Sequence, residues 1–398
     1  MRDLKHLIYF ENLLQQANND LVQDACKDGR LALAWNCSYI PEVLLDTDNC
    51  FGVRLRAPNC TNPDMATYYM TNRSCPYSKS ILERAFEGGY NFISALIGQE
   101  CCTTMNRMEQ YFEYCELIPN EKFFCTYLDM PLRKTEWHAG YYRRQIEQKI
   151  IQPLEKVYGV DFSEANLRKA VEQFNEVCRI MTEINAMREA ENPVITGYEF
   201  HVITLATYVA PKYLLIDKLE ETLEEVRSRE PEERAYRARI ALVGSEVDDS
   251  EFIRLIEDTG AYVCADRFCF GSLPGRDPIT LTDEDDALTQ ICRQYVYRGQ
   301  CPRTMNMEKV YGRKQYVADI AREYHADGIL YEQIKFCDPW AYERMMGSHI
   351  LHDDYGYPVL SIDRPYNIGT TNGQLRTRVQ AFVESLEIKR IHKEEGKA

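Results

Sequence analysis

The sequence predicts an α/β protein made of two similar parallel-sheet domains joined by a helical segment. Short apolar runs alternate with amphipathic helical patterns in the first and last thirds of the chain, which is typical of parallel strands with crossover helices. In the middle of the chain glycines nearly vanish and apolar residues recur at helical spacing. Sheets of this kind bind ligands at the carboxyl ends of their strands, and we expect a Rossmann or flavodoxin-like arrangement in both domains.

The N-terminal residues are expected to form a helical segment of mixed polarity, interpreted as one helix over 1–30. The first α/β domain is then expected over 31–135. Its apolar runs predict strands, and the amphipathic stretches between them predict helices. The strands are expected at 31–35, 52–56, 92–97 and 123–128, and the helices at 78–87 and 105–114.

Residues 136–235 are expected to be a helical segment that ends in a linker. Leu167, Val171 and Phe174 belong to an apolar stripe with helical spacing. Asn192-Pro193 interrupts the pattern, and the charged stretch around Pro231 predicts the linker to the next domain.

A second α/β domain is expected over 236–398. The two domains share an order of elements. In the first, Cys75 is followed by a helix, a strand, Cys102 and a helix, and in the second, Cys301 is followed by a helix, a strand, Cys337 and a helix. The sequence therefore indicates a duplicated domain. Strands are expected at 239–244, 262–268, 328–334 and 359–362, and helices at 251–258, 285–296, 306–324 and 374–386.

Composition argues against several classes of protein. The net charge of −15 disfavours a nucleic-acid partner, because phosphates need a basic surface. No apolar run is long enough to cross a bilayer, so no membrane span is expected. The first residues lack the pattern of an export signal, which favours a cytoplasmic location. Fifteen cysteines in such a chain favour a reducing compartment, where disulfides are rare.

Six of these cysteines stand where a strand gives way to a loop or where a helix begins. Thiolates gathered at the carboxyl ends of strands suit a soft metal centre, and iron–sulfur clusters are held by such sulfurs. The alternative is that a cysteine serves as a small core residue, which we expect for Cys125, Cys178 and Cys264. The six candidate ligands are Cys37, Cys75, Cys102, Cys269, Cys301 and Cys337.

Several common cofactor motifs are absent from the sequence. There is no Gly-x-x-x-x-Gly-Lys-Ser/Thr loop for ATP phosphates and no Gly-x-Gly-x-x-Gly fingerprint after a strand. There is also no Cys-x-x-Cys pair, so the usual ferredoxin and zinc-ribbon spacings are missing. Metal ligands would have to come from distant parts of the chain.

Seven short motifs, in order over most of the chain, resemble the 2-hydroxyacyl-CoA dehydratase and benzoyl-CoA reductase family. Together they form a specific pattern, to which the helical middle contributes little. They are CSYIPE at 37–42, VRLRAP at 53–58, SCPY at 74–77, CTTMNRM at 102–108, DGI at 327–329, KFCDPW at 335–340 and GQLRTRVQAFVE at 373–384.

The resemblance implies a [4Fe–4S] cluster held by three cysteines, which would be Cys75, Cys102 and Cys337. It also implies two partners: a homologous second subunit, and a separate ATP-hydrolysing iron–sulfur activator that injects one electron. The electron converts the acyl-CoA thioester to a ketyl radical anion, from which the hydroxyl at C2 leaves. The absence of an ATP motif here fits an outside source of energy. The expected activity is that of a radical-type 2-hydroxyacyl-CoA dehydratase subunit, a lyase.

Two alternatives remain open at this point. Cys37, Cys269 and Cys301 are three further cysteines, as in a branch of the family that holds a double-cubane [8Fe–9S] cluster with six cysteines and reduces small molecules. Cys101, beside Cys102, is a rival ligand, and Thr103 stands where relatives often have Asp. The other alternative is a non-catalytic subunit that relays electrons within a heterodimer.

Other residues give weaker signals. Cys37 lies where catalytic subunits can carry a short polar residue near the substrate, so it is also a catalytic candidate. Arg54 (catalytic) and Arg56 (cofactor-binding) share one face of a strand and are candidates for contacting CoA phosphates or an acyl carboxylate, against the alternative of a solvated strand end. A lone histidine in the approach to a helix, such as His138, is more often a structural residue than a catalytic base. Glu42 is expected to stabilise the first turn of a helix rather than to act in catalysis.

Overall fold

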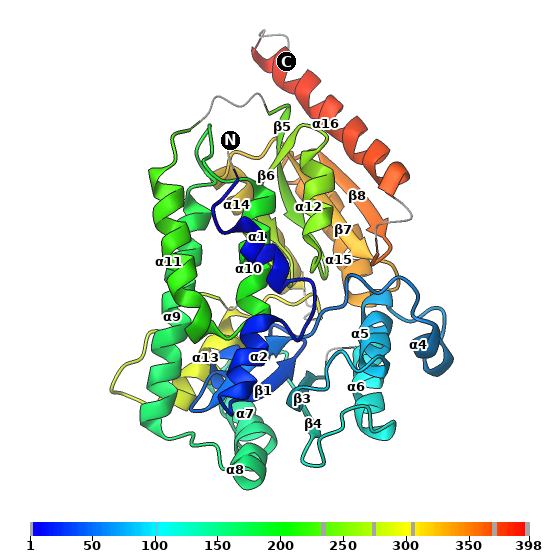
Figure 1. Ribbon diagram of the computed structural model, residues 1–398. Coiled ribbons are helices and arrows are strands. Elements are labelled where there is room, and N and C mark those ends of the chain that lie inside the picture. Colours follow the sequence, from blue (N-terminus) through cyan, green and yellow to red (C-terminus); the bar gives the residue numbers. More distant parts are fainter. Residues whose placement is uncertain are drawn as a thin grey trace.

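Two four-stranded parallel sheets organise the described part of the computed structural model (Figure 1). Both sheets have helices packed around them, so the predicted α/β fold class is confirmed. The structure describes residues 3–100, 102–231, 236–272, 276–303, 307–367 and 372–394.

The first sheet has the order β2-β1-β3-β4. Its inner strands β1 and β3 are almost wholly buried, because a parallel sheet is covered on both faces and needs near-continuous apolar runs such as LALAW in β1. Trp35 at the end of β1 pairs with Arg54 of β2 and with Ile97 of β3. The strands are β1 (Leu31–Trp35), β2 (Cys50–Arg54), β3 (Ile93–Gln99) and β4 (Phe124–Leu128).

The second sheet repeats this arrangement with the order β6-β5-β7-β8. Val243 at the end of β5 pairs with Arg267 of β6 and with Tyr331 of β7. Because strand order and pairing agree, each strand of one sheet has a counterpart in the other. The strands are β5 (Ala238–Val243), β6 (Ala261–Arg267), β7 (Gly328–Ile334) and β8 (Val359–Arg364).

Helices precede, connect and follow the strands. In the first half they are α1 (Leu7–Leu13), α2 (Asp20–Lys27), α3 (Glu42–Leu45), α4 (Asp64–Tyr69), α5 (Pro76–Phe86) and α6 (Thr103–Tyr114). The middle contains α7 (Glu136–Ile146), a π-helical turn (Glu147–Ile151), α8 (Gln152–Tyr158), α9 (Glu164–Ala186), α10 (Gly197–Val209) and α11 (Lys212–Ser228). The second half contains α12 (Ser250–Glu257), α13 (Ala287–Arg298), α14 (Met307–Glu323), α15 (Asp338–Asp353) and α16 (Asn372–Glu394).

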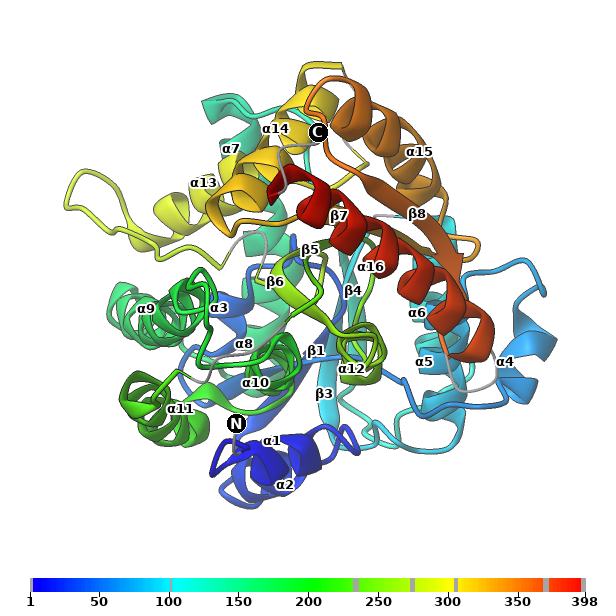
Figure 2. The ribbon, with the colours of Figure 1, turned by 90° about the horizontal axis from the view of Figure 1, so that it is seen from above.

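The helix α10 joins the two halves. It is buried almost all round, and it packs against β2 of the first sheet and β6 of the second. Seen from above, α9, α10 and α11 lie side by side, and α16 crosses the outer side of the second sheet (Figure 2). One apolar cluster of buried residues extends from the first sheet through these helices to the second, so the halves share a core. No helix in the described ranges is long and apolar enough to span a bilayer.

The strand predictions agree with the structure, with ends displaced by at most two residues, as is usual for element boundaries. The prediction of one helix over the N-terminal segment is wrong, since α1 and α2 are separate helices. Asn19 explains the break: its side chain accepts a hydrogen bond from the Val22 amide and donates to the carbonyls of Leu13 and Val209. Such a cap begins a new helix. The expected domain boundaries stay a prediction.

Candidate metal centre

The six candidate cysteines follow strands or precede helices. Cys37 and Cys269 each lie two residues beyond a strand, after β1 and β6. Cys75, Cys102 and Cys337 are the residues immediately before α5, α6 and α15. Cys301 lies between α13 and α14. Since parallel strands end at one edge of a sheet, these positions gather at the carboxyl edges of the two sheets.

The first thiol set consists of Cys75, Cys102 and Cys337. The pKa of Cys337 is raised well above its ordinary value, by burial first and then by the negative charges of Cys75 and Cys102. Burial likewise raises the pKa of Cys75 to about 12, and the charge of Cys102 adds to the rise. Two thiols from the first half and one from the second are therefore close enough to act on one another.

Helix starts favour negative charge at this set. The amides of Ser78 and Tyr77, in the first turn of α5, lower the pKa of Cys75, and the amide of Trp340, in the first turn of α15, lowers that of Cys337, both against the larger effect of burial. Backbone amides and the positive end of a helix stabilise a thiolate, and hydrogen bonds to sulfur tune a bound cluster.

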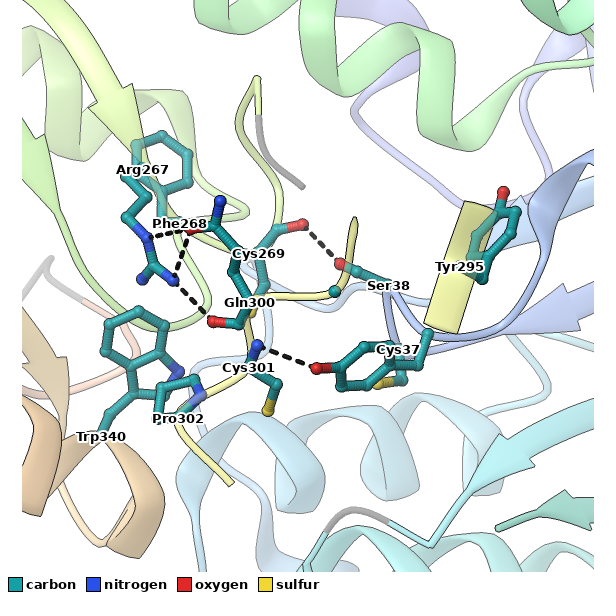
Figure 3. Close-up of a pocket in the computed structure, with 12 residues that line it drawn as sticks. Cys37, Ser38, Arg267, Phe268, Cys269, Tyr295, Gln300, Cys301, Pro302 and Trp340 are labelled. Atoms are coloured by element: carbon teal, nitrogen blue, oxygen red, sulfur yellow. Dashed lines mark hydrogen bonds between the residues drawn. The ribbon is translucent and has the colours of Figure 1, made fainter. Parts of the chain in front are cut away.

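The second thiol set consists of Cys37, Cys269 and Cys301, which line one small cavity of about 40 Å³ (Figure 3). Burial raises the pKa of Cys301 to about 12, and the charge of Cys37 is the next cause. Burial also raises the pKa of Cys269, with contributions from Cys301 and Cys37. This set takes one thiol from the first half and two from the second.

Close packing fixes the segment that carries Cys301. Its amide donates to the Tyr39 hydroxyl over 3.1 Å, and its sulfur accepts from the Arg303 amide over 3.5 Å. A Cβ on Gly299 would lie 1.9 Å from the Tyr39 ring, so a glycine is required at this approach.

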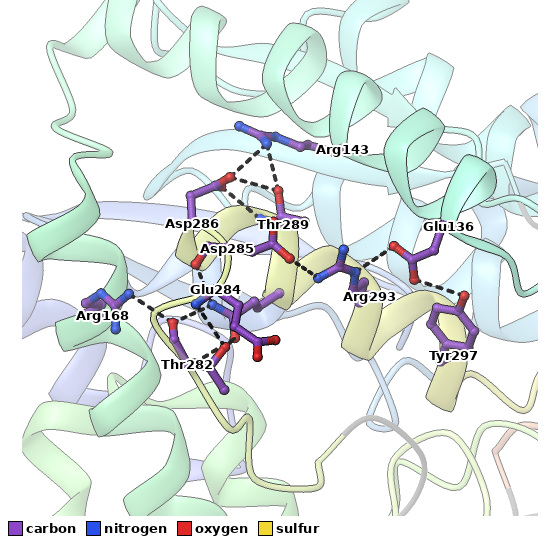
Figure 4. Close-up of polar contacts among 11 residues, drawn as sticks. Glu136, Arg143, Arg168, Thr282, Glu284, Asp285, Asp286, Thr289, Arg293 and Tyr297 are labelled. Atoms are coloured by element: carbon purple, nitrogen blue, oxygen red, sulfur yellow. Dashed lines mark hydrogen bonds and ion pairs between the residues drawn. The ribbon is translucent and has the colours of Figure 1, made fainter.

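The helix α13, which leads to Cys301, is attached to α7 by polar contacts (Figure 4). Arg143 of α7 pairs with Asp286 at 2.9 Å, and Arg293 of α13 pairs with Glu136 at 2.7 Å. The Tyr297 hydroxyl also donates to Glu136 over 3.1 Å. These groups are largely exposed, so each pair stabilises modestly, but together they fix the orientation of α13.

The donor chemistry of the two sets fits an iron–sulfur cluster. Buried thiols with raised pKa values stay neutral unless a cation is near, and a bound metal deprotonates a coordinating thiol. Across the described residues, no three His, Cys, Asp or Glu side chains converge as ligands of a single metal ion. A cluster does not require such convergence, because each of its cysteines binds a different iron.

Arg54 is buried, with 1% of the residue exposed, and is held on all sides. Its guanidinium donates to the Cys269 carbonyl over 2.5 Å and pairs with Glu246 at 3.4 Å. It also stacks on Phe270 at 3.8 Å, with two further rings, those of Trp35 and Tyr208, around it. Arg54 therefore joins the end of β2 to the second half, rather than ending in solvent.

Arg56 reaches across the same boundary. It donates to the Asp248 carbonyl through Nε and Nη2, over 3.0 and 2.7 Å, and to the Leu14 carbonyl over 2.6 Å. Both arginines, together with Arg84, line a cavity of about 380 Å³.

Sequence reasoning missed Glu246, which lies three residues beyond β5, one residue farther than Cys37 and Cys269 lie beyond their strands. Burial raises the pKa of Glu246 to about 8, against the opposing charge of Arg54. Its position beyond the carboxyl end of a strand is the same signal that pointed to Cys37 and Cys269.

The remaining predicted residues have structural surroundings. His138 is half-buried at the start of α7, where its Nδ1 lies 2.7 Å from the Thr135 hydroxyl. Glu42 is the first residue of α3, as expected, but it is buried and paired with Arg276 at 3.0 Å and Lys212 at 3.4 Å. Cys178 and Cys264 are buried core residues, as expected, whereas Cys125 is half-buried on β4. Cys101 lies outside the described residues.

Comparison with known proteins agrees with the resemblance of the motifs. The family described as 2-hydroxyglutaryl-CoA dehydratase, D-component, matches residues 37–386. The beta subunit of (R)-phenyllactyl-CoA dehydratase from Clostridium sporogenes is 24% identical over 95% of this chain and 97% of its own length. The beta subunit of lactoyl-CoA dehydratase from Anaerotignum propionicum is 22% identical over 87% and 90%. A benzoyl-CoA reductase subunit from Thauera aromatica is 18% identical over 79% and 80%. The chain therefore belongs to the 2-hydroxyglutaryl-CoA dehydratase D-component family.

Proposed function

We propose that this chain is an iron–sulfur subunit of a radical-type 2-hydroxyacyl-CoA dehydratase. The observation that carries the proposal is the first thiol set, in which Cys75, Cys102 and Cys337 precede three helices and influence one another's pKa values. Membership of the family and relatives named as dehydratase beta subunits support it.

The first thiol set would hold one [4Fe–4S] cluster. When bound, such a cluster supplies a low-potential electron and an iron able to act as a Lewis acid. The chain's own contribution is to bury the thiolates, to direct helix amides at their sulfurs and to keep Arg54 between the halves. Burial and hydrogen bonding are the means by which a protein sets a cluster's potential.

Two partners belong to this proposal. The sequence has no phosphate-binding loop for ATP, which favours an external ATP-hydrolysing activator. The relatives carry subunit names, which favours a homologous second subunit in a heterodimer.

For the substrate, we propose that acyl-CoA approaches through the cavity lined by Arg54, Arg56 and Arg84. We also propose that Cys37, which lines the separate cavity of the second thiol set, acts at the reacting end of the substrate. Carbonyl contacts already orient Arg54 and Arg56, so their cationic charge is fixed in place. A fixed guanidinium suits a phosphate or carboxylate of the substrate.

Anaerobic turnover tests this function. The purified chain, combined with its homologous subunit, is supplied with a 2-hydroxyacyl-CoA with and without activator plus ATP. Dehydration is expected only with both activator and ATP. Sustained dehydration without ATP or any strong reductant would contradict the radical mechanism and favour acid–base or Lewis-acid chemistry. Full activity when only the partner subunit retains its cluster ligands would favour a structural role for this chain and contradict both catalysis and electron relay by it.

The second thiol set favours a second candidate, a double-cubane reductase of small molecules. Cys37, Cys269 and Cys301 line one cavity, and each set contains the three thiols that one cubane needs. Iron and acid-labile sulfide per chain separate the candidates, since one cubane gives about four irons and two give about eight.

A further inference from the structure

Two arginines are buried behind the segment that carries Cys301. Arg267 is the last residue of β6 and is 2% exposed, and Arg313 lies in α14 and is 3% exposed. A guanidinium group stays charged in a protein, and a buried charge is costly unless a partner offsets it. The partners of these two arginines therefore indicate what their charge does here.

Arg313 is paired with Glu343 of α15, which is 1% exposed. Its Nε and Nη2 donate to the two carboxylate oxygens, each over 2.8 Å, a bidentate contact that fixes the plane of the guanidinium. Lys314 also pairs with Glu343, and its Nζ donates to the Tyr331 hydroxyl over 3.1 Å. Burial lowers the pKa of Lys314 to about 7, so the two arginines are the permanent cations behind the Cys301 segment.

Arg267, by contrast, has neutral partners. Its Nη2 donates to the Gln300 carbonyl over 2.6 Å, and its Nε donates to the side-chain oxygen of Gln300 over 3.4 Å (Figure 3). Its guanidinium also lies 5.5 Å from the centre of the Trp340 ring. Within the described ranges Arg267 donates to no carboxylate. Two permanent cations and the single carboxylate of Glu343 therefore leave a surplus of positive charge.

The two arginines hold consecutive residues of one segment. Arg267 binds the Gln300 carbonyl, and Arg313 Nη1 donates to the Cys301 carbonyl over 3.5 Å. Arg267 also lies two residues before Cys269, so it joins the strand that leads to Cys269 to the segment that carries Cys301. Arg267, Cys269 and Cys301 line the same cavity. The surplus charge is therefore placed beside two thiols of the second set.

Thiolates bring negative charge, and neighbouring arginines stabilise them. We propose that Arg267 and Arg313 are positioning residues of the second thiol set, and that their buried charge offsets the negative charge of an iron–sulfur centre held there. This inference rests on the second candidate function, in which Cys37, Cys269 and Cys301 hold a cubane. The charge around a cluster helps to set its reduction potential. A nearby positive charge stabilises the reduced state, which carries one more electron, and so raises the potential.

Redox titration of the reconstituted full chain, followed by EPR spectroscopy, tests the proposal. Arg267→Gln and Arg313→Gln remove the charge, whereas Arg267→Lys and Arg313→Lys keep a charge on a side chain of different shape. Arg239→Gln is the matched control. Arg239 also donates to backbone carbonyls, among them those of Arg188 and Tyr324, but it lies near the start of β5, at the opposite end of the second sheet. Iron and sulfide are counted in each sample, and circular dichroism checks the fold.

The wild-type chain is expected to bind about eight irons, as two cubanes. Each Gln variant should have one cluster signal whose midpoint potential is more negative than in wild type. The Lys variants should stay close to wild type, which a role in shape alone would not produce. Arg239→Gln should leave both signals unaltered. If a Gln variant folds but falls to about four irons, the Lys variant at the same position should keep about eight.

Equal potentials in wild type and in both Gln variants, at full iron content, would overturn the proposal. Lys variants that shift or lose iron as far as the Gln variants would overturn it as well, because charge would then not be the property that matters. A wild-type chain that binds about four irons, all lost in Cys75→Ala, would overturn this inference and leave the leading proposed function intact. A wild-type chain that binds neither iron nor sulfide would overturn both.

Discussion

The two sheets share a strand order, yet each brings a carboxylate to the ends of its first and third strands by a different route. In the first sheet the Glu109 side chain extends from α6 over Gly98 of β3. A Cβ added to Gly98 would lie 2.5 Å from the carboxyl carbon of Glu109. In the second sheet the strand β7 itself carries Glu332, and the absence of a side chain at Gly244 makes room for its carboxylate. A Cβ added to Gly244 would lie 2.1 Å from a carboxylate oxygen of Glu332. By strand pairing Gly98 and Glu332 occupy corresponding positions.

The partners of the two carboxylates differ more than their positions. Glu332 accepts a hydrogen bond from Arg364 Nε over 2.8 Å and others from the amide and hydroxyl of Ser245. Glu109 accepts from Asn36, and its Oε2 has no hydrogen-bond partner among the described residues. Burial raises the pKa of Glu109 to about 8. The second half thus has a locked ion pair where the first has an uncompensated acid, so the two halves resemble each other more closely in backbone than in electrostatics.

The thiols show the same divergence. Cys37, two residues after β1, corresponds to Ser245 after β5, and Cys269 after β6 corresponds to Arg56 after β2. Each half supplies three of the six thiols, but from different loops. The two sets therefore cross between the halves instead of belonging to one half each.

The strongest test of this crossing is removal of the single thiol that the second half gives to the first set. Cys337→Ala should lose nearly all iron and sulfide of the first cluster, as Cys75→Ala and Cys102→Ala should, because a cubane with two thiolates is poorly held. Anaerobic metal analysis and the visible absorbance measure the loss. Cys178→Ala, in the core of α9, is the control and should keep its iron. Full iron in Cys337→Ala would show that the halves do not share this site.

A second test compares the corresponding residues Cys75 and Cys301, each followed by proline. If only the first set holds metal, Cys301→Ala keeps about four irons per chain, whereas Cys75→Ala loses them. If both sets hold metal, each variant loses iron, from a starting value of about eight. Iron and sulfide analysis of the two variants beside wild type decides between one cubane and two.

A third test compares the two glycines beneath the carboxylates. Gly244→Ala is expected to destabilise the protein by about 3 kcal/mol, because Glu332 is held by Arg364 and cannot easily move. Gly98→Ala should cost about 1 kcal/mol, since Glu109 has no comparable anchor. Chemical denaturation measures both. Gly312→Ala, in α14 with open space around it, is the control and should be neutral or slightly stabilising. Equal costs for Gly98→Ala and Gly244→Ala would contradict the contrast in rigidity.

The last test concerns the pH dependence of stability, which is expected to have opposite signs in the two halves. For Glu42, the charges of Arg276 and Lys212 outweigh burial and lower the pKa to about 2 from its ordinary 4.5. Its contribution of about 3 kcal/mol is present above pH 4.5 and is lost as the pH falls toward 2. The difference in unfolding free energy between wild type and Glu42→Gln should therefore shrink over that range.

For Glu257 in the second half, burial raises the pKa to about 7. Its contribution is present below pH 4.5 and is lost as the pH rises through 7, so the stability of wild type should fall relative to Glu257→Gln over this range. Urea denaturation between pH 3 and pH 8 measures both pairs. Parallel pH profiles for the two variants would contradict the difference in sign.

The fold was largely predictable because its signals are local. The run LALAW is a continuous apolar segment, and the run from Gly328 to Ile334 is apolar apart from Glu332 and Gln333. The structure places β1 and β7 over the same residues that were predicted. The approximate neighbourhood of the cysteines followed from the rule that strand ends share one edge.

The division of the thiols into two sets could not be predicted, because it depends on how the halves dock. The role of Arg54 was equally hidden: its spacing in VRLRAP indicates an exposed strand end, whereas Tyr208 and Phe270, distant in sequence, enclose it. Glu246 carried a usable signal, its place after a strand, but attention to cysteines alone passed over it.

The crossing of the thiol sets has a consequence for synthesis of the protein on the ribosome. More than half of the chain separates Cys102 from Cys337, so a growing chain holds only two ligands of the first set until its last third has emerged. Domains tend to fold in order as they leave the ribosome, so the first sheet forms before its missing ligand exists. If the first set holds the proposed cluster, delivery of iron must wait until Cys337 has been synthesised, and a prematurely ended chain that lacks Cys337 would not form the complete centre.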